Sequence, residues 1–86
     1  MNRVVVLVLL LWGAPALAQK PQAVALKRQA DAYLTEGAPA KAVAAYRKAI
    51  ALDPKYLDAY ESLAAHYLRL QEYGTAITVL EGTIAV

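Results

Sequence analysis

The sequence predicts an all-α fold, an α-α superhelix built from two antiparallel helix pairs. Apolar residues recur at three- and four-residue steps in four separate segments, which is the period of an amphipathic helix. Similar residues reappear 34 positions later along the chain, and no segment alternates polar and apolar residues as a strand would. Because the breaks between the four segments are short, consecutive helices are expected to pack antiparallel.

The first 18 residues predict an export signal. Arg3 supplies a positive start, Val4 to Trp12 is a run of nine apolar residues, and Ala16-Leu17-Ala18 has the small-x-small pattern that signal peptidase accepts. We therefore expect cleavage after Ala18 and a periplasmic or secreted protein without stable membrane insertion. The alternative is an uncleaved membrane tether, although the charge-free run covers only 15 residues and a span needs about 20.

The amino-acid composition excludes several classes of function. The absence of cysteine excludes disulfides, thiolate metal sites, a cysteine nucleophile and lipoprotein anchoring. The chain has nine Lys and Arg residues and seven Asp and Glu residues. The basic residues form no stripe along the sequence, so nucleic acid is not an expected partner. The single His and single Ser have no catalytic partners around them, and Asp58 with Glu61 reads as the solvated first turn of a helix. We predict no enzyme activity, no metal and no cofactor.

The first helix pair is predicted within residues 23–56, after a short segment at 19–22. Its first helix ends near Gly37 and Pro39. Its second helix ends at Pro54, because the proline ring clashes with the preceding turn and pushes Asp53 away from helical angles. The apolar stripes are Leu26, Ala30, Tyr33 and Leu34 in the first helix, and Ala42, Val43, Tyr46, Ala49 and Ile50 in the second.

The second pair is predicted within residues 57–86. Its first helix runs from about Tyr56 to Leu70, and a break near Gln71 and Glu72 separates it from the last helix. The stripes are Tyr60, Leu63, Ala64 and Tyr67, followed by Ala76, Ile77, Leu80 and Ile84.

The run from Ala42 to Pro54, Ala-x-x-x-Tyr-x-x-Ala-Ile-x-Leu-Asp-Pro, resembles the tetratricopeptide repeat family. The resemblance covers 64 of the 86 residues: a complete unit at 23–56 and an incomplete one at 57–86 that lacks its closing turn and cap. Gln29, Thr83, Leu80 and the helical Gly82 depart from the family pattern. The resemblance implies a repeat core of Leu26, Ala30, Tyr33, Ala42, Tyr46, Ala49, Pro54, Tyr60, Leu63, Ala64, Tyr67, Ala76 and Leu80.

The resemblance also implies that the protein binds a protein or peptide through a groove lined by the first helix of each pair. A carboxylate clamp of the kind known in this family is not expected, because Asp31 stands where the family has Asn and would repel a carboxylate. The implied groove residues are Val24, Lys27, Arg28, Asp31, Leu34, Asp58, Glu61, Ser62, Ala65, Leu68 and Arg69.

The last predicted helix would leave Ile77, Leu80 and Ile84 partly bare, since no closing proline or polar cap follows it. Two repeats are also fewer than the roughly three usually needed for stability. Three alternatives stay open. The chain could be the docking segment of a larger envelope enzyme or assembly machine, it could pair with itself or another chain through this face, as in a structural homodimer, or it could be a weakly stable monomer.

Overall fold

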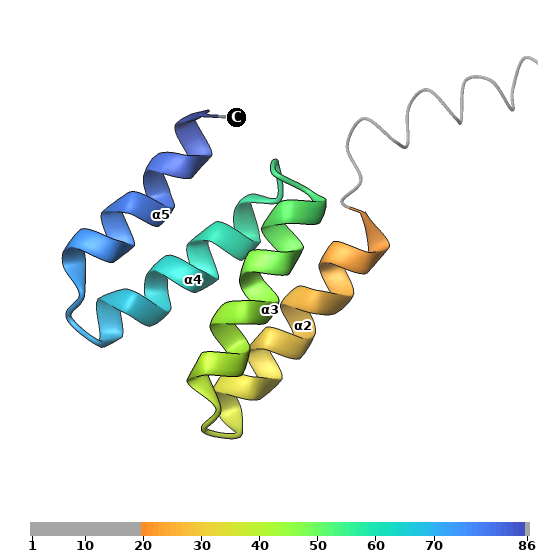
Figure 1. The fold of residues 1–86 in the computed structure, drawn as a ribbon, viewed down its shortest axis with the longest axis horizontal. Helices are drawn as coiled ribbons and strands as arrows, with labels where there is room; N and C mark the ends of the chain where they lie inside the picture. Colours follow the sequence, from red (N-terminus) through yellow and green to blue (C-terminus); the bar gives the residue numbers. More distant parts are fainter. Residues whose placement is uncertain (1–19, 86) are drawn as a thin grey trace, which may run out of the picture.

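The computed structural model describes residues 20–85, which form four α-helices (Figure 1). These residues contain no strand, so the predicted all-α fold is confirmed. The predicted signal, its cleavage point and Val86 lie outside the described residues. None of the described helices is both long and apolar enough to cross a membrane. The helices are α2 (Pro21–Thr35), α3 (Pro39–Leu52), α4 (Leu57–Arg69) and α5 (Tyr73–Ala85).

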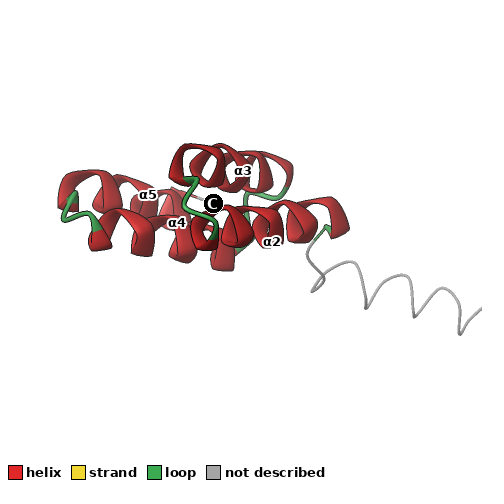
Figure 2. Ribbon diagram, turned by 90° about the horizontal axis from the view of Figure 1, so that it is seen from below, coloured by secondary structure: helices red, strands yellow, loops and turns green. Residues whose placement is uncertain are grey.

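The four helices pack in chain order. α2 lies antiparallel to α3, α4 lies antiparallel to α5, and α3 packs against α4 to join the two pairs (Figure 1). In two perpendicular views α2 and α5 lie at opposite ends of the described structure (Figures 1 and 2). Each pair therefore presents one surface to the other pair and one surface to the outside.

The turns within the two pairs repeat one another. Gly37 follows α2 with φ of 78°, and Gln71, 34 residues later, follows α4 with φ of 61°. In the first turn the Gly37 N–H donates to the Leu34 carbonyl at 3.2 Å and the next N–H donates to the Tyr33 carbonyl at 2.8 Å. The N–H groups of Gln71 and Glu72 make the equivalent two bonds at 3.0 and 2.9 Å. Such bonds satisfy carbonyls that a helix end leaves without partners.

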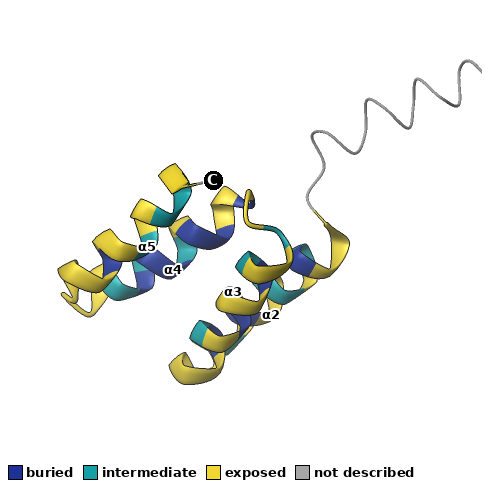
Figure 3. Cartoon of the chain, turned by 45° about the horizontal axis from the view of Figure 1, so that its top comes forward, coloured by how far each residue is buried: buried dark blue, intermediate teal, exposed yellow. Residues whose placement is uncertain are grey.

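Small alanines and one large tyrosine form the centre of the fold. Ala30, Ala42 and Ala49 are fully buried, and their small side chains let the helix backbones approach closely. Tyr46 is 1% exposed and is the largest fully buried side chain of the described residues. Figure 3 shows buried positions along the facing sides of α2, α3 and α4 and mostly exposed ones along α5. The other predicted core residues that are buried are Tyr60, Leu63, Ala64 and Ala76, whereas Leu26, Tyr33 and Tyr67 are half-buried.

Two residues of the implied repeat core, Pro54 and Leu80, are exposed; Pro54 was expected at a closing turn and Leu80 on a partly bare face. Pro54 lies in the turn between α3 and α4, where its carbonyl accepts a hydrogen bond from the Tyr60 hydroxyl at 2.8 Å. Leu80 is 39% exposed because no described helix covers its side of α5. Conversely, sequence reasoning missed five buried residues: Ala23, Ala45, Tyr56, Ala59 and His66.

Candidate functional site

A groove of about 310 Å³ opens between α2 and α4. Both helices are the first members of their pairs, and α3 supplies the remaining side chain through Tyr46. The groove has apolar walls from Leu34 and Ala65 and polar groups from Ser62 and Arg69. The residues that line this α2–α4 groove are Asp31, Leu34, Thr35, Tyr46, Ser62, Ala65 and Arg69.

Asp31 organises one side of the groove. Its carboxylate accepts a hydrogen bond from the Tyr46 hydroxyl and forms an ion pair with Lys27, whose Nζ lies 2.9 Å away. Burial raises the pKa of Tyr46, and the hydrogen bond to Asp31 raises it further. The hydrogen bond to Asp31 is also the main reason why the pKa of Lys27 is raised. The Lys27 ammonium is therefore already paired within the protein, with a carboxylate that lies one helical turn further along α2.

Arg69 marks the other side of the groove. It lies in the last turn of α4, where a positive charge is favoured by the helix dipole. Within residues 20–85 it forms no ion pair, and its side chain is exposed. The guanidinium thus remains free to donate hydrogen bonds to a carboxylate or a peptide carbonyl of a ligand.

The family comparison bears on this groove. The family model for the TPR repeat matches residues 30–71, which span the second half of α2, all of α3 and all of α4. This stretch of the chain is therefore similar to TPR repeats. No curated protein and no solved structure matches the chain. TPR repeats generally mediate protein–protein interaction and typically bind proteins or peptides.

The groove residues implied by the TPR resemblance fall into two sets. Asp31, Leu34, Ser62, Ala65 and Arg69 come together in the α2–α4 groove. The others lie outside its lining. Val24 packs into the small cluster around Ala23 and Tyr56, Lys27 pairs with Asp31, and Arg28, Asp58, Glu61 and Leu68 are exposed.

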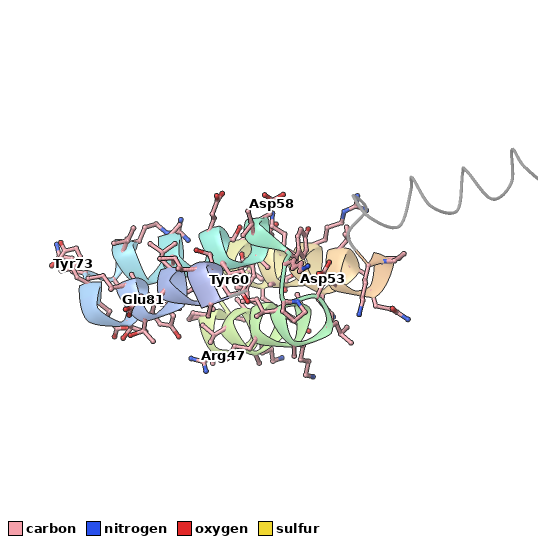
Figure 4. The ribbon with its side chains drawn as sticks, turned by 90° about the horizontal axis from the view of Figure 1, so that it is seen from above. Arg47, Asp53, Asp58, Tyr60, Tyr73 and Glu81 are labelled. Carbon is pink, nitrogen blue, oxygen red and sulfur yellow. The ribbon has the colours of Figure 1, made fainter. Side chains whose placement is uncertain are left out.

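The charges outside the groove have a simple arrangement. Asp58 lies in the first turn of α4, where the helix dipole favours an acidic residue, and Figure 4 shows it at the edge of the molecule opposite Arg47. The negative charge of Asp58 contributes to the raised pKa of Lys27, after the larger effects of Asp31. Acidic charge therefore lies near the start of α4 and basic charge, at Arg69, near its end.

Sequence reasoning placed Tyr46 in the core and missed its role in the groove. Its ring is buried, while its hydroxyl reaches the groove side of α2 and holds Asp31. The sequence did carry a signal for this role, because a buried tyrosine hydroxyl usually finds a hydrogen-bond partner.

His66 is 7% exposed and its ring centroid lies 5.5 Å from that of Tyr67, so it belongs to the packed interior. Among residues 20–85 no group of three or more His, Cys, Asp or Glu side chains is arranged to hold a metal ion.

Proposed function

We propose that this protein is an exported adaptor that binds a segment of another protein in the α2–α4 groove. The observation that carries the proposal is the convergence of side chains from two different helix pairs on one groove of about 310 Å³. TPR repeats generally mediate protein–protein interaction, which supports the same assignment.

The groove chemistry defines the ligand. Leu34 and Ala65 offer an apolar surface for an aliphatic side chain of the ligand, and burying it there would supply about 25 cal/mol per Å² of apolar area. Ser62 and Arg69 offer polar contacts from α4. We therefore expect a peptide segment that combines an aliphatic residue with a carboxylate or carbonyl placed to meet Arg69.

The pairing of Lys27 supports a mode of binding other than the carboxylate clamp. A clamp needs cationic groups that are free to grip the carboxylate at the end of a peptide. Here Lys27 is paired with Asp31, and Asp31 itself lines the groove. A terminal carboxylate placed between these two residues would be repelled by Asp31.

Affinity capture tests the proposal. The immobilised chain is exposed to an envelope fraction and compared with Arg69→Gln, which removes the groove guanidinium and keeps a good helix-forming residue. Arg47→Gln on α3 is the matched control, since Arg47 is an exposed arginine outside the α2–α4 groove. We expect Arg69→Gln to lose partners that both the original chain and Arg47→Gln retain. Equal capture by all three forms would remove the support for this groove.

Export is part of the proposal and has its own test. The apolar run and the Ala16-Leu17-Ala18 pattern support cleavage after Ala18. Mass spectrometry of the protein recovered from the producing cell should then give a chain that begins at Gln19. A chain that still begins at Met1 and fractionates with membranes would support the tether instead.

The exposed face of α5 favours a second candidate function, a structural homodimer. Ile77 is 57% exposed and Ile84 is 85% exposed, which is a large apolar exposure for one short helix. A docking segment of a larger envelope enzyme or assembly machine would use the same α2–α4 groove. Sedimentation of the purified chain separates the homodimer from the adaptor, because only the homodimer requires self-association.

A further inference from the structure

The exposed face of α5 repeats a face of α3 that is covered. In α3, Val43, Tyr46 and Ile50 pack in or against the core cluster that includes Leu63, Tyr67 and Val79 of the second helix pair. The residues 34 positions after the first three are Ile77, Leu80 and Ile84, which are 57%, 39% and 85% exposed. α5 therefore presents the kind of surface that α3 uses to receive another helix pair.

The outer surface of the first pair carries the matching groove. A groove of about 230 Å³ between α4 and α5 is bordered by Arg47 and Ile50 of α3. A second groove, of about 340 Å³, lies between α2 and α3. Six positions of the two grooves correspond at a spacing of 34: Leu26 with Tyr60, Gln29 with Leu63, Lys41 with Thr75, Ala44 with Thr78, Ala45 with Val79, and Lys48 with Gly82. Both helix pairs thus form the same docking groove.

The two grooves differ in what borders them. The α4–α5 groove has residues of α3 at its border, whereas the lining of the α2–α3 groove comes from α2 and α3 alone. The positions in α5 that correspond to Arg47 and Ile50 are Glu81 and Ile84, and both are exposed. Figure 4 shows Arg47 on α3 and Glu81 on α5, both away from the edge that carries Asp58.

From this correspondence we infer that the chain associates head to tail, with α5 of one copy docked in the α2–α3 groove of the next. Ile84 and Glu81 take the places that Ile50 and Arg47 occupy beside the α4–α5 groove. The contact is heterologous, because each copy contributes a different surface. Successive copies therefore form an open, head-to-tail filament. The inference stands apart from the proposed binding in the α2–α4 groove, since it uses other residues.

Charge complementarity identifies a second copy as the occupant. Within one chain, the basic Arg47 borders the α4–α5 groove, which carries the uncharged residues Thr75 and Gly82. The corresponding residues of the α2–α3 groove are Lys41 and Lys48, and the incoming residue that takes the place of Arg47 is the acidic Glu81. Compared with the contact inside one chain, the docking residue is acidic instead of basic and the groove is basic instead of uncharged, so the two surfaces attract each other. Such complementarity steers association and rejects like-charged partners.

The apolar part of the contact fits as well. The ring of Tyr33 and the side chain of Leu26 are half-buried in the α2–α3 groove, and Lys41 lies over the Tyr33 ring with its Nζ 5.9 Å from the centroid. Ile84 of the preceding copy would cover this apolar floor while Glu81 of that copy meets the lysines at the rim. Long lysine stems also cover apolar surface while their charged ends remain in water.

Charge-reversal variants test the inference on the protein as it is recovered from the producing cell. Sedimentation velocity is measured over a range of concentrations for the original chain, for Glu81→Lys and for the double variant Lys41→Glu plus Lys48→Glu. Each variant places like charges across the contact, so we expect self-association to weaken on the order of tenfold or more in each. An equimolar mixture of the two variants should restore association, because every contact between different variants is again complementary.

The possible outcomes separate the alternatives. A homodimer formed by two α5 helices alone would be altered by Glu81→Lys and left unchanged by the lysine double variant, and that result would overturn the inference. Association that is absent in the original chain up to about 1 mM, as when α5 is covered by something other than a second copy, would overturn it too. All substituted residues are exposed, and circular dichroism checks that each variant retains its helices. The mixture keeps the test decisive, since an unfolded variant could not restore association.

Discussion

The Tyr60 ring lies against the backbone of α5 at Gly82, so closely that a Cβ there would be 2.9 Å from Cε1 of the ring. The corresponding residues of the first pair, 34 positions earlier, are Leu26 and Lys48. The larger ring therefore faces the residue without a side chain, and the smaller leucine faces the residue with a long one. Glycine in a helix costs roughly 1 kcal/mol relative to alanine, and this contact explains why the fold accepts it here.

The first prediction is that Gly82→Ala lowers the free energy of unfolding by about 1–3 kcal/mol, despite the better helix propensity of alanine. The Tyr60 ring cannot easily move away, because it is 6% exposed and its hydroxyl is bonded to the Pro54 carbonyl. Urea unfolding followed by circular dichroism measures the change.

Gly74→Ala is the matched control on the same helix. No atom lies within 4 Å of a Cβ built at Gly74, so this variant should gain up to about 1 kcal/mol. The double variant Tyr60→Leu plus Gly82→Ala imitates the leucine of the first pair and should remove the clash. If Gly82→Ala proved as stable as Gly74→Ala, the close packing of Tyr60 on α5 would be wrong.

The second prediction concerns the turn after α4. Gln71 has a positive φ of 61°, a conformation that glycine adopts without steric cost, and Gly37 holds the equivalent place after α2. Gln71→Gly should therefore raise the free energy of unfolding by about 0.5–1 kcal/mol, while Gly37→Gln should lower it by about the same amount. Thermal unfolding of both variants measures the two effects. Changes of the same sign in both would contradict the equivalence of the turns.

The third prediction is a loss of stability at alkaline pH. The folded protein raises the pKa of Tyr46 and of Lys27 above their ordinary values of 10.0 and 10.5, so the unfolded chain releases these protons first. The folded state then binds more protons, and the free energy of unfolding falls as the pH rises through about 10 and above. Tyr46→Phe removes one of the two groups, so the fall should be shallower in that variant.

Urea titrations at a series of pH values from 8 to about 11 provide the measurement. At pH 8 the same variant should lose about 1.5–3 kcal/mol, the usual worth of a hydrogen bond to a charged group such as Asp31. Tyr33→Phe is the control, because the Tyr33 hydroxyl accepts only an exposed hydrogen bond from Gln29. An unchanged pH slope in Tyr46→Phe would show that Tyr46 is not a source of the alkaline loss.

The helices and much of the core could be predicted from the sequence. Proline and glycine mark the first two turns, and the repeat of Ala30 at Ala64 and of Ala42 at Ala76 marks buried crossings, because small side chains recur where helix backbones meet. Periodicity alone does not predict the exposure of Leu80, since it shows which residues share a face and leaves open whether anything covers that face. That exposure was expected only because no closing proline or polar cap follows the last helix.

The groove could be predicted only in part. Positions taken from the family resemblance brought Asp31, Leu34, Ser62, Ala65 and Arg69 to one place, and the structure shows them lining one groove. The pairing of Lys27 with Asp31 follows from their four-residue spacing on a helix, but which of them a ligand could reach depends on Tyr46. That side chain comes from another helix, 15 residues along the chain.

Site-specific photo-crosslinking in the producing cell tests the central claim, that a protein partner binds in the α2–α4 groove. A photo-reactive residue is placed at Thr35, which is exposed and lines the groove, and at Lys55, an exposed control in the turn before α4. The groove assignment predicts a discrete adduct with another protein from position 35 that disappears when Arg69→Gln is added, and no such adduct from position 55. Adducts of equal yield at both positions, or an adduct at 35 that Arg69→Gln leaves unchanged, would contradict it.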